Sequence, residues 1–224
     1  MTYAAIPASA DVHALGEGPV WDPVRGRLLW VDIVAGVLHE GVLDPGTGLV
    51  TATGRHAFGS TVAAVAVAGD GRLIVAEKET LTRVDLDGRR TEPARVLPDG
   101  VRSRLNDGAV DPAGRFLVGS LAQDDRGGEE VLVRLDRTGL THLDTDLTLS
   151  NGLAWIGERL YSVDTGAPHT SSVAFAGPDL DLLVITTSTL GLTEADLAAH
   201  PDSGRLFTCR PGVRGLPTPY WNPF

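Results

Sequence analysis

Three polar residues open segments of this 224-residue sequence that look alike, and their side-chain oxygens could bind a hard cation. Glu17 begins EGPVWDPVRGRLLWVDI, Asn106 begins NDGAVDPAGRFLVGS and Asn151 begins NGLAWIGERLYSVDT. One carboxylate and two amides suit Ca²⁺, Mg²⁺ or Mn²⁺ better than a soft metal. The alternative interpretation is that Glu and Asn before a strand bond the backbone of the adjoining turn.

These segments are copies of an internal repeat, which must position the three residues. Two further copies begin at Ala63 (AAVAVAGDGRLIVAE) and Ser171 (SVAFAGPDLDLLVITT). Each copy has an apolar strand, an Asp/Gly turn and a second apolar strand, and three copies continue into further strand-like residues. The first four starts are separated by 46, 43 and 45 residues. This period, with about four strands per unit, predicts an all-β fold, a β-propeller of four-stranded blades.

A propeller would bring the opening residues together. The first strand of each blade lines the central channel, so the residues that open the repeats would face one shared space. We therefore expect Glu17, Asn106 and Asn151 at one mouth of that channel.

One interval breaks the period. Only 20 residues separate Asn151 from Ser171, so the fourth repeat stops after two strands, at Asp164–Thr165. Judged by the period of the other repeats, about one and a half blades, or roughly 70 residues, are missing between Asp164 and Ser171. With them the chain would form about six blades, and without them four and a half. We predict a single propeller domain over residues 1–224; the gap is either an omitted segment or a deletion.

Composition narrows the function classes. The net charge of −10 and the lack of a Lys/Arg stripe predict no nucleic-acid binding. No stretch approaches the ~20 apolar residues of a membrane span, and no signal peptide is recognisable, which predicts a cytoplasmic protein without membrane contact. Cys209 is the single cysteine, which excludes intrachain disulfides and thiolate-clustered zinc.

The six histidines fall at unrelated blade positions and are expected on the surface or in loops. The best helix candidate is 192–200, with Thr193 as N-cap.

Three motifs carry a resemblance to a known family. LGEGPVWDP, RLNDGAVDPAGRFLVGSLA and LSNGLAW, in this order and spacing, resemble the SMP-30/gluconolactonase/regucalcin-like family of six-bladed propellers. The likeness runs from about residue 13 to 165 and resumes from His169 to Pro217. It implies a divalent-metal-dependent hydrolase of lactones, with sugar lactones as the leading substrate class. Some members act on phosphotriesters or simple lactones.

The resemblance also implies roles for individual residues. Glu17 and Asn151 match two of the family's ligands to one divalent metal ion, which could be Ca, Mg, Mn or Zn. Arg104 and Asn106 match residues that contact substrate, and Asn106 is sometimes counted as a ligand through water. Asp124 falls, in a looser match, where some members have an acidic substrate contact.

The chain departs from the family in one respect. The family's third metal ligand, an aspartate that also serves as general base, opens the fifth blade, and it has no counterpart between Asp164 and Ser171. The catalytic base is therefore not assigned. A site with one carboxylate and one or two amides would hold a metal weakly, and no group would deprotonate water. The alternative function is a non-catalytic propeller that binds a small ligand or a protein partner.

Overall fold

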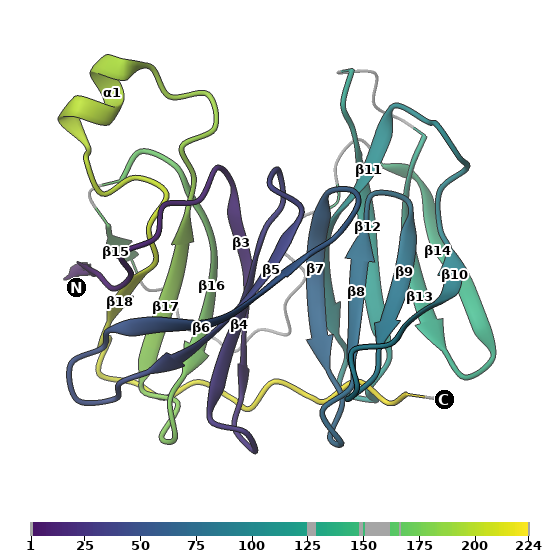
Figure 1. Ribbon diagram of the computed structural model, residues 1–224, viewed down its shortest axis with the longest axis horizontal. Coiled ribbons are helices and arrows are strands. Elements are labelled where there is room, and N and C mark those ends of the chain that lie inside the picture. Colours follow the sequence, from purple (N-terminus) through teal and green to yellow (C-terminus); the bar gives the residue numbers. More distant parts are fainter. Residues whose placement is uncertain (1, 125–128, 148–149, 151–161, 166, 224) are drawn as a thin grey trace. The chain divides into compact units, whose positions relative to one another are not determined.

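The computed structural model describes residues 2–124, 129–147, 150, 162–165 and 167–223 (Figure 1). The fold is an all-β propeller of four-stranded antiparallel blades, as the repeat predicts. Four such blades are present in the described residues. Each blade follows one copy of the repeat, because every copy alternates short apolar runs with Asp/Gly turns.

The strand bounds follow the repeat closely. The first blade comprises β3 (Gly16–Asp22), β4 (Arg27–Asp32), β5 (Val37–Leu43) and β6 (Val50–Ala57). The second comprises β7 (Val62–Val67), β8 (Leu73–Glu77), β9 (Thr80–Val84) and β10 (Arg90–Arg95). The third comprises β11 (Ser103–Val110), β12 (Phe116–Ala122), β13 (Glu130–Asp136) and β14 (Gly139–Leu147).

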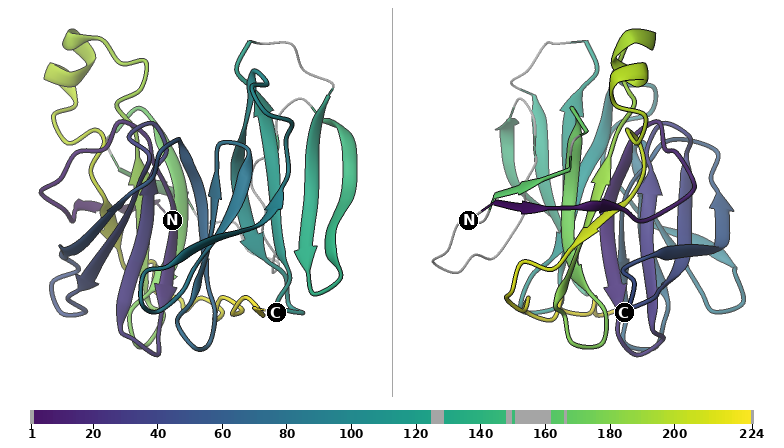
Figure 2. Two further views of the ribbon diagram at one scale, coloured as in Figure 1. Left: turned by 45° about the vertical axis from the view of Figure 1, so that its right-hand side comes forward. Right: turned by 90° about the vertical axis from the view of Figure 1, so that its left-hand side faces the viewer.

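The fourth blade combines a strand near the N-terminus with three strands from the last third of the chain. It comprises β16 (Thr170–Ala176), β17 (Leu182–Thr187), β18 (Phe207–Cys209) and the N-terminal β2 (Ile6–Pro7), which pairs with β18. Helix α1 (Glu194–Ala199) lies between β17 and β18, and Figure 2 shows it beyond the end of this sheet. Thr193 caps it as predicted, in a capping box with Asp196. No helix in the described ranges is long and apolar enough to cross a membrane.

The short fourth repeat follows the prediction only in part. Its first strand and turn were expected within residues 151–161, which lie outside the described residues. Its second strand is present as β15 (Ser162–Asp164). This strand pairs in parallel with β1 (Thr2–Ala4). The repeat did not predict this parallel pairing with the N-terminus.

The chain divides into two compact units, each with its own core. Unit 1 is Met1–Ala57 with Gly157–Pro217, and unit 2 is Phe58–Ile156 with Thr218–Phe224. In unit 1, Trp21, Leu28 and Trp30 pack with Val184 and Leu206 between the first and fourth blades.

The core of unit 2 lies between the second and third blades. Ala64, Ile74, Leu105 and Phe116 are buried together there. The C-terminal Trp221 joins this core, and its backbone N–H donates to Val67 O at 2.8 Å. Burial of apolar surface at about 25 cal/mol per Å² is the main stabilising contribution in each unit.

Every blade has a β-bulge in its first strand, at or next to the residue that opens the repeat. In β11, Leu105 pairs with Ser120 and Gly108 with Val118, so Asn106 and Asp107 face one residue of β12. Similar shifts follow Glu17 in β3 and flank Ala63 in β7 and Ser171 in β16. Bulges of this kind re-aim side chains and recur next to active sites.

Candidate functional site

Glu17 lies in β3 of unit 1, directly before the bulge of that strand. Glu17 is the last paired residue before the bulge, opposite Val31 of β4. Gly18 follows with φ of 50°, a left-handed conformation that glycine adopts without steric cost. The Gly18 N–H donates to Glu17 Oε2 at 2.9 Å. The bulge thus holds the carboxylate close to its own backbone.

A hydroxyl pair from the fourth blade supports the strand at Glu17. Ser171 Oγ donates to the carbonyl oxygen of Gly16 and lies 2.9 Å from Thr186 Oγ1. Gly16 allows this close packing, because a Cβ there would lie 2.9 Å from the Thr187 carbonyl oxygen. Ser171, which opens its own repeat, therefore fixes the residue before Glu17.

In unit 2, Arg104 and Asn106 form a directly bonded pair on β11. The Arg104 guanidinium donates to Asn106 Oδ1 at 2.9 Å and to the Leu105 carbonyl oxygen at 3.0 Å. Asn106 Nδ2 donates to the Ser150 carbonyl oxygen at 3.0 Å. These contacts set which way the amide points, with its oxygen toward the guanidinium. The structure thus brings together two of the three residues that the resemblance assigns to substrate contact.

Asp124 lies just beyond the end of β12, near the start of β11. The Gln123 N–H donates to the Arg102 carbonyl oxygen at 2.8 Å, which holds this loop against the strand that carries Arg104. The Asp124 carboxylate is 4.0 Å from an Arg102 guanidinium nitrogen. Asp124 therefore lies at the same end of the β11–β12 hairpin as Arg104.

Of the predicted metal pair, the structure describes only Glu17. Asn151 lies outside the described residues, and Glu17 belongs to unit 1 whereas Asn106 belongs to unit 2. Within the described ranges, no group of three or more His, Cys, Asp or Glu side chains could hold a metal ion. Glu17 fits a hard cation in kind, as a carboxylate oxygen donor, and would need amide or water oxygens to complete the coordination.

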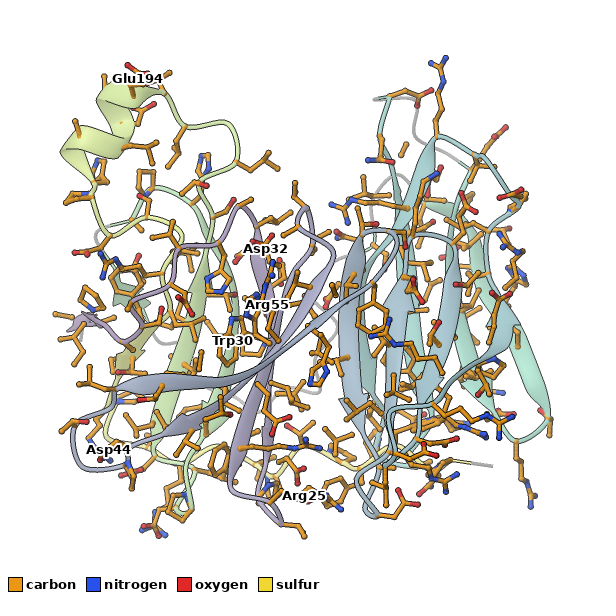
Figure 3. All side chains as sticks on the ribbon, viewed as in Figure 1. Arg25, Trp30, Asp32, Asp44, Arg55 and Glu194 are labelled. Carbon is orange, nitrogen blue, oxygen red and sulfur yellow. The ribbon has the colours of Figure 1, made fainter. Side chains whose placement is uncertain are left out.

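One histidine corrects the expectation that histidines lie on the surface or in loops: His39 lies on strand β5 and is buried, whereas His13 is in the loop before β3, as expected, but is also buried. His13 and His39 are only 2% and 9% exposed. The Trp30 indole N–H donates to His13 Nε2 at 2.9 Å, and the His39 ring stacks on Trp30. Trp30, His39 and Arg55 are cross-strand neighbours on β4, β5 and β6; Figure 3 shows Trp30 and Arg55 along the same part of the blade.

Sequence reasoning missed three residues that support Asn106. Ser150 contributes its backbone carbonyl, which leaves no side-chain signal. Gly119 resembles any strand glycine. Glu130 follows another glutamate and so looks like a surface acid, but it is 3% exposed. Ser103 Oγ donates to its carboxylate at 2.7 Å, and Ser120 Oγ also donates to it.

Comparisons with known proteins identify the family of this chain. A family model described as "SMP-30/Gluconolactonase/LRE-like region" matches residues 15–165. The pentonolactonase XacC of Haloferax volcanii is 40% identical over 157 residues, which are 68% of this chain and 50% of that protein. The 6-deoxy-6-sulfogluconolactonase of Pseudomonas putida is 35% identical over 69% of this chain and 52% of its own length.

Solved structures support the fold. A calcium-binding protein, regucalcin, from Agrobacterium tumefaciens superposes with a TM-score of 0.82 at 20% identity, over 99% of each chain. A luciferin-regenerating enzyme superposes with a TM-score of 0.79 at 18% identity, over 97% of this chain and 99% of its own. The chain spans about half the length of the two lactonases above. Because the family model covers well over half of the sequence, this chain belongs to the SMP-30/gluconolactonase/LRE-like family.

Proposed function

We propose that this protein hydrolyses lactones, with sugar lactones as the substrate class. The observation that carries the proposal is the Arg104–Asn106 pair, held in one orientation on a bulged first strand. The family membership and the lactonase names of its relatives support the same reaction. Because those relatives are about twice as long as the matched part, the activity of the whole protein belongs to the proposal.

The reaction adds water to the lactone carbonyl and breaks the ring carbon–oxygen bond, which yields a hydroxy acid. In our proposal Arg104 donates hydrogen bonds to ring or hydroxyl oxygens, and Asn106 keeps the guanidinium in place. Asp124 accepts a hydrogen bond from a substrate hydroxyl. A guanidinium presents five N–H donors in a fixed plane, which suits a ligand rich in oxygen.

A divalent cation would complete this chemistry. In the proposal Glu17 and Asn151 hold one ion (Ca, Mg, Mn or Zn), which as a Lewis acid would polarise the substrate carbonyl. No residue is assigned as general base. The attacking hydroxide would then come from solvent, so the enzymatic rate should rise with pH and show no plateau from a titrating base.

The test is turnover of a panel of aldono- and simple lactones by the purified chain, followed by acid release with and without chelator. Arg104→Ala should lower kcat/KM at least tenfold, whereas Arg214→Ala, on a side chain of unit 1 that is 71% exposed, should change it little. Equal activity in the two variants would contradict the assignment of Arg104.

The missing counterpart of the family's aspartate favours a second candidate, a propeller that binds lactones or polyols without turnover. Calorimetric titration with the same panel separates the two. Binding without acid release in the presence of each divalent cation would support the binding protein and contradict the enzyme.

A further inference from the structure

Ser150 packs directly against Gly119 in unit 2. A Cβ at Gly119 would lie 1.9 Å from Ser150 Oγ and 2.0 Å from Ser150 Cβ, far inside contact distance. Gly119 is in β12, opposite the bulge that carries Asn106. Its φ is outside the left-handed region, so a larger residue is excluded there by Ser150 and not by the backbone. Ser150 is itself 6% exposed.

The polar groups of Ser150 that matter here are backbone groups. Its N–H donates to the Ser120 carbonyl oxygen at 3.1 Å, and its carbonyl oxygen accepts from Asn106 Nδ2 at 3.0 Å. The same carbonyl forms the peptide bond to Asn151. Because Gly119 has no side chain, Ser150 can lie against β12 with its carbonyl oxygen in hydrogen-bond distance of Asn106.

Strand β12, which carries Gly119, is also held by hydrogen bonds at the next residue, Ser120. Ser120 Oγ donates to the buried Glu130 carboxylate and accepts from the Val131 N–H at 2.9 Å. Ser103 Oγ also donates to Glu130, at 2.7 Å, and Ser103 directly precedes Arg104. The Glu130 carboxylate thus connects β11, β12 and β13 next to Arg104. Ser150, more than β12, should move when the contact is crowded.

We propose that Gly119 is a positioning residue for the substrate site: it admits Ser150, whose carbonyl sets the orientation of the Asn106 amide toward Arg104. This inference rests on the proposed lactone site for its catalytic consequence. The orientation itself is a property of the chain and can be measured without substrate.

The experiment uses Gly119→Ala, Ser150→Gly and the double variant, with Gly59→Ala as the matched control. Gly59 is also outside the left-handed region, and nothing lies within 4 Å of a Cβ placed there. Side-chain amide resonances report the orientation directly. The sequence contains only four such groups, at Gln123, Asn106, Asn151 and Asn222, so the Asn106 pair is assigned by Asn106→Asp.

Gly119→Ala should shift the Asn106 amide resonances and speed their exchange with solvent, and should lower kcat/KM by about tenfold to a hundredfold. Ser150→Gly should resemble the wild type, because both of its backbone bonds remain. The double variant removes the added overlap and should restore the amide signals and most of the activity. Gly59→Ala should change neither.

Three results would overturn the proposal. The first is an unchanged Asn106 amide in Gly119→Ala. The second is a double variant that does not recover. The third is loss of the whole cooperative melting transition in Gly119→Ala, which would show a packing role only. If the wild type turns over no lactone, the proposed function fails, but the amide signals still decide whether Gly119 positions Asn106.

Discussion

Asn106 accepts a hydrogen bond from Arg104 and donates one to the Ser150 carbonyl, so a single amide joins a guanidinium to a backbone segment 44 residues away. An amide can make both bonds because it carries a donor and an acceptor. A carboxylate of the same shape cannot, since both of its oxygens only accept.

This difference predicts the effect of Asn106→Asp. The new oxygen would face the Ser150 carbonyl oxygen, and the donated hydrogen bond would be lost. We expect kcat/KM for lactones to fall at least tenfold. The free energy of unfolding should fall by only about 1 kcal/mol, the net value of one hydrogen bond. Steady-state kinetics beside urea denaturation measure both, and a variant as active as the wild type would contradict the role given to the amide.

The histidine pair predicts how stability depends on pH. Burial, and then the neighbouring His13, lower the pKa of His39 from 6.5 to about 4. The unfolded chain therefore takes up this proton near pH 6.5, whereas the folded chain resists it until about pH 4. The contribution of His39 to the free energy of unfolding is fully present above pH 6.5. It is lost as the pH falls toward 4, by an amount on the order of 3 kcal/mol.

Chemical denaturation between pH 4 and 8 measures this loss. His39→Phe keeps an aromatic ring against Trp30 and removes the titrating group, so it should flatten the stability profile between pH 4 and 6.5. His142→Gln changes an exposed histidine and should leave the profile as in the wild type. A wild-type and a His39→Phe profile with the same slope would refute the assignment.

A crowded glycine in the first blade gives a prediction about stability alone. A Cβ at Gly41 would lie 2.8 Å from the Thr51 carbonyl oxygen and 3.0 Å from the Trp30 ring. Gly41→Ala should destabilise the protein by about 1–3 kcal/mol through overpacking. Gly54→Ala, on the paired strand β6, meets only contacts of 3.4 Å and longer and should cost less. Melting temperatures that fall equally in both variants would argue against the crowding.

Much of the fold could be predicted because the repeat is explicit in the sequence. Glu17, Ala63, Asn106 and Ser171 all lie in first strands, as their place in the repeat indicates. The parallel pairing of β1 with β15 could not be predicted, since three-residue strands leave no periodicity and their partner is about 160 residues away. The contribution of β2 to the fourth blade is equally non-local.

In the candidate site, too, the contact that is local along the chain could be predicted and the distant ones could not. Arg104 and Asn106 are two residues apart on one strand, so their contact follows from alternation along it. The carbonyl of Ser150 and the space at Gly119 depend on backbone positions that no residue type reveals. The burial of Glu130 depends on two serines from other strands. His13, in the loop before β3, contacts both His39 of β5 and Trp30 of β4, and nothing in the sequence pattern indicates this contact.

The measurement that tests the proposed function most directly is calorimetric titration of the wild type and Glu17→Gln with Ca²⁺, Mn²⁺ and Zn²⁺, beside lactone turnover and melting curves in chelator. Glutamine keeps the shape of Glu17 and removes the negative charge that a hard cation needs. Glu92→Gln, on a half-exposed side chain of β10, is the matched control. The account predicts that Glu17→Gln loses metal affinity and lactonase activity together, with the metal-free melting temperature little changed. Metal titration and turnover that match the wild type, with reduced metal-free stability, would show that Glu17 serves only the strand and would contradict the metal-dependent lactonase.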